Sequence, residues 1–195
     1  MTPIEKIGPS RLGILLAEYD NYSQIYQPSE LFGYFHGDSC VGYCLVGASD
    51  SPGFATIKRK YVATDYRCQG IGTLLTRQAF QWAREEEFVG VKSTINGVFQ
   101  LDTQGNVCIP NPDFTRDYYG NGGVDSLKAV LKVMPVTLGM ESFNLGGKGL
   151  IDVSYQTYFE HQDIPPYTLT TNQVSEITSF VAEVGRLQNW QNTVW

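Results

Sequence analysis

The chain has 195 residues, of which 42% are hydrophobic and 13% aromatic, and its formal net charge is -6. This composition excludes a disordered chain, and the length fits one domain with a sizeable core. The acidic balance excludes a general nucleic-acid binder, which needs a surplus of Lys and Arg. No apolar run has the length that spans a bilayer, and the N-terminal sequence MTPIEKIGPSRL lacks the features of a signal peptide.

The cysteines are expected to be free thiols. Cys40, Cys44, Cys68 and Cys108 form no C-x-x-C pair, and the chain has two histidines. We therefore expect no zinc site and no other metal. A cytoplasmic location follows by default from this use of cysteine.

The first third of the chain has the pattern of one helix followed by three strands. Ser10 is a suitable N-cap for the helix. Two apolar, aromatic-rich runs flank Gly37-Asp38-Ser39, which indicates a β-hairpin, and Ser49–Gly53 indicates a second turn. The predicted elements are a helix over Ser10–Tyr22 and strands over Phe32–His36, Val41–Val46 and Phe54–Ala63.

The remaining chain begins with its clearest helix, Gly70–Glu87, whose apolar residues recur at three- and four-residue spacing. After it we expect a strand, an added hairpin, a polar loop, a helix, two strands and a final amphipathic helix. These are Phe88–Ile95, the pair Phe99–Leu101 and Val107–Ile109, Asn111–Gly123, Asp125–Val133, Met140–Leu145, Leu150–Phe159 and Gln173–Gln191. We expect residues 1–195 to form a single domain. Residues from about 160 to 195 would be a helical extension that packs on that domain or across a homodimer.

The segment Val62–Leu75, VATDYRCQGIGTLL, has the chemistry of an anion site. The first N–H groups of a helix lack intrahelical acceptors, and the helix dipole favours negative charge there. Gly70 and Gly72 lack Cβ atoms, so a phosphate can approach the backbone, and Arg67 adds a cation. The segment fits neither the dinucleotide fingerprint nor the Walker loop. A plain strand-to-helix turn is the alternative.

The same string resembles the acetyl-CoA-binding motif of the GNAT superfamily of N-acyltransferases. The core of that motif is Arg or Gln, two residues, Gly, one residue, then Gly or Ala, which here are Arg67, Gly70 and Gly72. Thr64 replaces the proline that is usual in the family. The resemblance implies an α/β (α+β) fold with a mixed, mostly antiparallel central sheet and flanking helices. It also implies acetyl-CoA as the co-substrate and a primary amine as the acceptor.

The resemblance assigns coenzyme contacts to the end of the strand and to the turn. The backbone near Tyr61 and Val62 would pair with the pantetheine arm. The pyrophosphate would be bound beside Arg67 by the amides of Cys68, Gln69, Gly70, Ile71, Gly72 and Thr73. In this family the strand before the motif diverges from the next strand, here Phe88–Ile95, and the thioester lies between them.

Two usual catalytic positions of the family have no matching residue. Many members carry a glutamate base on the strand before the motif, but Phe54–Tyr61 contains no carboxylate. Many members also place a tyrosine acid where this chain has Pro135. Tyr118 and Tyr119 in the polar loop are therefore the candidate proton donors for the thiolate, with surface tyrosines as the alternative. The other candidates are Tyr155, Tyr158 and His161 for proton transfer, and Glu141 and Asp152 for binding a cationic amine.

Lys58, Arg59 and Lys60 alternate across the strand before the motif. One that faces the cleft would attract an anionic substrate or a coenzyme phosphate. The leading hypothesis is an N-acyltransferase that moves an acetyl group from acetyl-CoA to a primary amine. The alternative is a catalytically inactive GNAT-fold protein that acts as a coenzyme A-binding or protein-interaction module. In a third reading, the added hairpin and the aromatic loop form a partner surface.

Overall fold

The computed structural model describes residues 3–20, 29–101, 103–104, 107–108, 123–134, 136–145 and 148–159. Tyr118, Tyr119, His161 and the predicted C-terminal helix lie outside this part of the chain. The described residues divide into two compact units, one that runs to Ser93 and includes 156–159, and one that covers 94–155. The organisation of residues 1–195 as a single domain stays a prediction.

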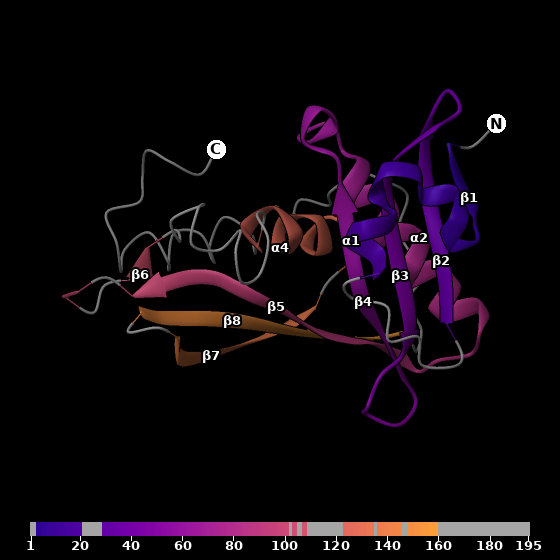
Figure 1. Cartoon of the computed structure of the whole chain (residues 1–195). Coiled ribbons are helices and arrows are strands. Elements are labelled where there is room, and N and C mark those ends of the chain that lie inside the picture. Colours follow the sequence, from indigo (N-terminus) through magenta and orange to yellow (C-terminus); the bar gives the residue numbers. More distant parts are fainter. Residues whose placement is uncertain are drawn as a thin grey trace. The chain divides into compact units, whose positions relative to one another are not determined.

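The first unit is built on a mixed sheet, as predicted. Its strands are ordered β1 (Ile4–Lys6), β2 (Ser29–His36), β3 (Ser39–Ala48), β4 (Phe54–Val62) and β5 (Gly90–Leu101). Figure 1 labels these strands. All neighbours are antiparallel except β4 and β5, which are parallel. The predicted hairpin is confirmed, because β2 and β3 pair along their lengths and turn at Gly37.

The first predicted helix is partly wrong. Pro9–Leu15 is the 3-10 helix η1, and only Leu16–Asp20 is α-helical, as α1. The N-cap is Gly8 rather than Ser10, and no side chain caps η1. Gly13 has φ 57° and ψ -123°, a conformation that interrupts a helix and that glycine adopts without a Cβ penalty.

The predicted helix after Arg67 is confirmed as α2 (Ile71–Glu85), with Gly70 at its N-cap. A short 3-10 helix, η2 (Thr64–Tyr66), lies between β4 and this turn. α2 packs closely on the sheet at Gly42 of β3. A Cβ atom there would lie 3.3 Å from Leu75 Cδ1 and 3.1 Å from the Tyr61 carbonyl oxygen. Glycine at this position therefore lets the helix approach the strands.

The other face of this sheet packs against η1 and α1. Tyr61 of β4 contacts the buried cluster on this face, which includes Leu12, Leu15, Tyr19, Leu31, Tyr43 and Leu45. Tyr19 meets Tyr43 edge-on at 6.2 Å between ring centroids, and Tyr43 stacks on Tyr61 at 6.1 Å. Aromatic contacts therefore extend from α1 across β3 to the end of β4.

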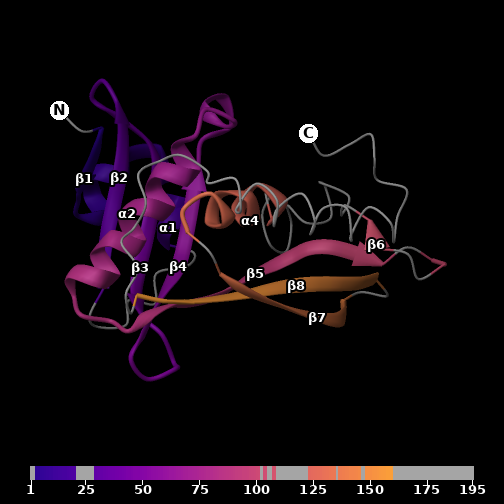
Figure 2. The ribbon, with the colours of Figure 1, turned by 180° about the vertical axis from the view of Figure 1, so that it is seen from behind.

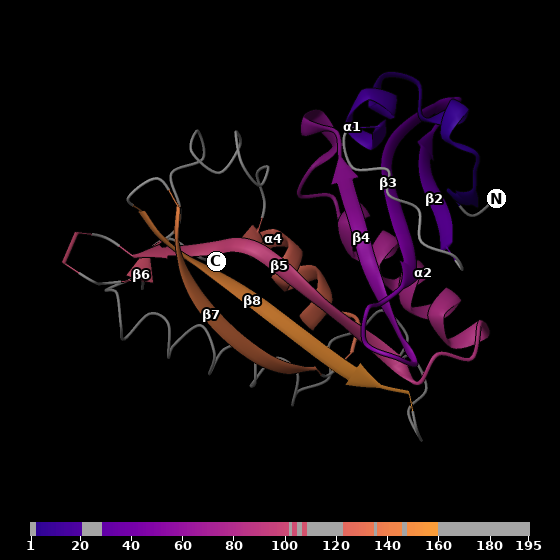
Figure 3. The same cartoon turned by 60° about the horizontal axis from the view of Figure 1, so that its bottom comes forward.

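The second unit contains strands in the order β6 (Val107–Cys108), β5, β8 (Lys148–Tyr158) and β7 (Thr137–Leu145). Figures 2 and 3 show β5, β8 and β7 side by side. The added hairpin is confirmed by the pairing of Gln100 with Cys108. The predicted helix is α4 (Gly123–Leu131), whose Leu127 packs with Val98 and Ile151. Among the described residues, no helix combines the length and apolarity required to cross a membrane.

Candidate coenzyme and acceptor site

The second edge of β4 is largely unpaired by the described strands. β4 pairs with β3 as far as Val62, which lies opposite Gly42. Its parallel pairing with β5 joins only Phe54 to Gly90 and Ala55 to Val91. This limited pairing agrees with the divergence of strands that the family resemblance implies, and it leaves backbone groups of β4 for an extended ligand.

A β-bulge at Lys58 decides which side chains of β4 face which helix. Leu45 pairs with Arg59 and Val46 pairs with Ile57, so Lys58 is an additional residue on β4. Beyond the bulge the side chains alternate again. Arg59 and Tyr61 therefore face η1 and α1, whereas Lys60 faces α2.

The turn after β4 concentrates backbone donors. Cys68 has φ 59° and Gly70 has φ 81°, so two left-handed residues lie within three positions. Within this described turn, the amides from Cys68 to Gly72 have no backbone acceptor, whereas the Thr73 amide donates to the Gly70 carbonyl at 3.0 Å. Successive N–H groups in such a turn form a concave anion site. The glycine at 72 leaves room there, since a Cβ atom would meet only Val62 Cγ2, at 4.0 Å.

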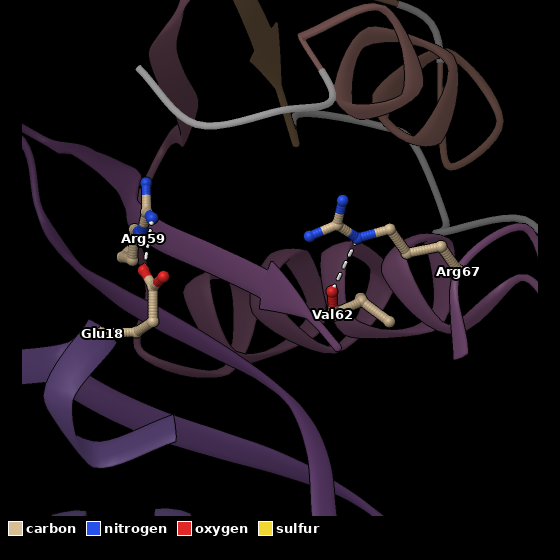
Figure 4. Close-up of polar contacts among 4 residues, drawn as sticks. All are labelled: Glu18, Arg59, Val62 and Arg67. Atoms are coloured by element: carbon tan, nitrogen blue, oxygen red, sulfur yellow. Dashed lines mark hydrogen bonds and ion pairs between the residues drawn. The ribbon is translucent and has the colours of Figure 1, made fainter. Parts of the chain in front are cut away.

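Arg67 lies over the end of β4. Its Nε donates to the Val62 carbonyl oxygen at 2.9 Å, as Figure 4 shows. Its guanidinium carbon lies 5.5 Å from the Tyr61 ring centroid. These two contacts hold a planar cation at the end of β4, directly before the donor turn in the sequence, while both Nη groups have no partner among the described residues.

A carboxylate does lie beside β4, although β4 supplies none. Arg59 Nη2 lies 3.0 Å from Glu18 Oε2 of α1 (Figure 4). The Arg59 side chain is 17% exposed and the Glu18 side chain 40%. Glu18 could not be identified from the sequence, because it lies 41 positions from Arg59 and no local spacing joins the two residues.

Lys60 extends from β4 toward α2. Its Nζ donates to Thr76 Oγ1 at 2.7 Å, and Thr76 Oγ1 donates to the Gly72 carbonyl oxygen at 2.8 Å. Burial lowers the pKa of Lys60 to about 8. Cys44, its partner across the β3–β4 pairing, is fully buried, and burial raises the pKa of its thiol to about 12.

Several other predicted site residues have ordinary structural contacts. Asp152 accepts hydrogen bonds from the Gly97 amide at 2.7 Å and from Asn96 Nδ2 at 2.8 Å, which fix β8 to β5. Tyr155 is buried, and the Tyr158 hydroxyl accepts a hydrogen bond from Gln156. Within the described ranges, no group of three or more His, Cys, Asp or Glu side chains could hold a metal ion.

Residues 7–98 match the model of the acetyltransferase (GNAT) family. Over 96 residues the chain is 38% identical to streptothricin acetyltransferase A of Bacillus subtilis (strain 168). The aligned region is 49% of this chain and 50% of that protein, so the chain spans about half the length of this curated relative.

The fold is similar to that of two solved ribosomal-protein-alanine N-acetyltransferases. The enzyme of Brucella melitensis matches with a TM-score of 0.53 at 16% identity, over 80% of this chain and 99% of that one. The enzyme of Escherichia coli matches with a TM-score of 0.53 at 10% identity, over 86% and 100%. These likenesses confirm the predicted fold class.

Proposed function

We propose that this chain, whose residues 7–98 belong to the acetyltransferase (GNAT) family, transfers an acetyl group from acetyl-CoA to a primary amine. The observation that carries this proposal is the donor turn from Cys68 to Gly72, with Arg67 fixed beside it. Free amides and a guanidinium together suit a pyrophosphate, which offers several anionic oxygens.

The free edge of β4 gives the rest of the coenzyme a place. A pantetheine arm that leaves the turn can extend along β4 from Val62 toward the bulge at Lys58, where it would pair with backbone groups. The thioester would then lie near Arg59. A backbone N–H of this edge would donate to the thioester oxygen as negative charge develops on it.

In the reaction, the nitrogen lone pair of a neutral amine attacks the thioester carbonyl carbon. The C–S bond then breaks, and sulfur leaves with the bonding electrons as a thiolate. The amine nitrogen loses a proton to give the amide, and the thiolate gains one. Tyr118 and Tyr119 remain our proposed donors of that proton. A tyrosine hydroxyl has a reference pKa near 10, so the tyrosine side chain is a proton donor at neutral pH.

The acceptor proposal starts from the curated relative, whose name identifies streptothricin as its acceptor. We place streptothricin first in a panel of primary amines that also contains peptide N-termini and lysine. A cytoplasmic location is proposed with it, on the free cysteines alone.

Calorimetric titration of acetyl-CoA into the wild type and Gly70→Val tests coenzyme binding. The variant places a β-branched residue at φ 81° beside the donor turn, so we expect binding to be lost. Gly37→Val is the matched control, because Gly37 has φ 60° in the β2–β3 turn and no atom within 4 Å of its Cβ position. Equal affinity in the wild type and Gly70→Val would exclude this turn.

Thiol release from acetyl-CoA in the presence of the amine panel separates an enzyme from a binding module. An amine-dependent release supports the transferase. Coenzyme binding without release from any amine would favour the inactive module, whose supporting observation is that β4 has no carboxylate.

A further inference from the structure

Lys60 carries a positive charge into the layer between β4 and α2. Within the described part of the chain, the hydrogen-bond partner of its Nζ is the neutral hydroxyl of Thr76, and no carboxylate pairs with it. Lys60 is partly buried, and a cation that is partly removed from water without a counter-ion is costly, so proteins usually pair such a charge. The charge at this position therefore needs a reason other than packing.

The hydrogen bonds of Lys60 connect it to the donor turn. Thr76 lies in α2, and its hydroxyl, which accepts from Lys60, donates to the carbonyl of Gly72. These two residues are four positions apart in the helix, a rise of about 6 Å. The chain of hydrogen bonds from Lys60 therefore ends in the first turn of α2, which also presents the free amides of Ile71 and Gly72.

We propose that Lys60, held between β4 and α2 by Thr76, is a cation of the coenzyme site that strengthens pyrophosphate binding through the Thr76–Gly72 connection without touching the coenzyme. This inference rests on the proposed function, because it needs an anion at the turn. A unit charge about 10 Å from an anion, at an effective dielectric constant near 20, changes affinity by roughly tenfold. The bound anion in turn supplies the counter-charge that Lys60 lacks in the protein interior.

A pH dependence follows from the geometry. Among the described residues, Cys44 on β3 and Thr76 on α2 face Lys60, and the Cys44 thiol is the titratable one; burial keeps it protonated, with a pKa of about 12. A bound anion favours the charged form of Lys60 and raises its pKa above the value of about 8 in the free protein. Coenzyme affinity is then constant well below pH 8 and falls as the pH rises above it.

The first test is the dissociation constant of acetyl-CoA between pH 7 and pH 10 for the wild type and Lys60→Met. We expect the wild-type constant to rise roughly tenfold across this range. For Lys60→Met we expect a dissociation constant that is roughly tenfold higher than that of the wild type at pH 7 and that does not change with pH. Lys6→Met is the matched control, since Lys6 lies on β1 and pairs with Glu30 at the surface.

The second test uses no substitution at Lys60 and is independent of its effect on folding. Calorimetry at pH 8.5 in two buffers of different ionisation enthalpy measures proton uptake when acetyl-CoA binds. We expect about half a proton per coenzyme.

Wild-type affinity and wild-type pH dependence in Lys60→Met would overturn this inference, as would binding without proton uptake. Either result leaves the proposed function intact. Absence of acetyl-CoA binding by the wild type at every pH would instead overturn the proposed function itself.

Discussion

Glu18 of α1 and Arg59 of β4 form an ion pair across 3.0 Å (Figure 4). The pair lies on the same sheet face as Tyr61, which stands two residues from Arg59 and contacts Arg67. A carboxylate with a half-exposed side chain is therefore held beside the strand on which many family members carry their own glutamate. Glu18 Oε1 has no partner among the described residues, so it is available to an acceptor ammonium group.

We predict that Glu18→Gln raises the KM for the amine by roughly tenfold or more, because a hydrogen bond to a charged group contributes about 1.5–3 kcal/mol. The affinity for acetyl-CoA is expected to stay unchanged. Steady-state kinetics with the amine varied gives the first quantity and calorimetry the second. Glu5→Gln is the control, since Glu5 pairs with Arg11 at 2.8 Å on the exposed surface. An unchanged KM in Glu18→Gln would remove Glu18 from acceptor binding.

Arg67→Lys is predicted to weaken acetyl-CoA binding by roughly tenfold while the melting temperature changes little. Lysine cannot reproduce the planar fork that donates to the Val62 carbonyl and presents two further nitrogens. Calorimetry and thermal unfolding measure the two effects. Arg11→Lys is a matched control, because Arg11 also stacks on an aromatic ring, Phe35, at 4.5 Å. Equal weakening in both variants would contradict a specific role for Arg67.

The stability of Lys60→Met relative to the wild type is predicted to depend on pH. Folding lowers the pKa of Lys60 from 10.5 to about 8, so the unfolded chain binds more protons between these values. The charged Lys60 therefore lowers the free energy of unfolding of the wild type by its full amount below pH 8. This cost decreases as the pH rises toward 10.5. Lys60→Met should be more stable than the wild type at pH 7, and its advantage should shrink by pH 10.

Urea unfolding of both proteins at pH 6, 7, 9 and 10 checks this prediction. Burial of Cys44 acts in the opposite direction, because folding raises the pKa of its thiol to about 12 and stability falls as the unfolded thiol ionises. The effect of Cys44 is common to both proteins and cancels in their difference. A difference that does not change between pH 7 and pH 10 would show that Lys60 does not titrate in this range.

Tyr118→Phe or Tyr119→Phe is predicted to lower kcat by roughly ten- to a thousandfold with similar coenzyme affinity, if the changed residue donates the proton to the thiolate. Both residues lie outside the described part of the chain. Steady-state kinetics on the two single variants is the measurement, with Tyr34→Phe on β2 as the control. Wild-type turnover in both variants would leave water or another tyrosine as the donor.

The local elements of this fold could be predicted from the sequence because each has a local cause. Gly37-Asp38-Ser39 marks the β2–β3 turn, and the three- and four-residue spacing marks α2. The prediction of the first helix was wrong at Gly13, whose conformation interrupts the helix and cannot be inferred from the adjacent residues in the sequence. The predicted strand at Phe88–Ile95 is instead Gly90–Leu101, because pairing with β6 extends it.

The contacts around β4 could not be predicted, since they depend on one irregular residue. The sequence shows three consecutive cations, but the bulge at Lys58 decides that Arg59 meets Glu18 and that Lys60 meets Thr76. The donor turn could be predicted because its backbone donors, its glycines and Arg67 are neighbours in the sequence. The Glu18–Arg59 pair joins residues brought together only by the packing of α1 on the sheet.

The short pairing between β4 and β5 has a consequence for handling the protein. An unpaired strand edge is a template on which a strand of another chain can add. On our proposal the pantetheine arm occupies this edge as a removable strand, in the manner of β-augmentation. The coenzyme-free protein should therefore self-associate more readily at high concentration than the loaded protein, and coenzyme A in the purification buffer should act as a protective additive.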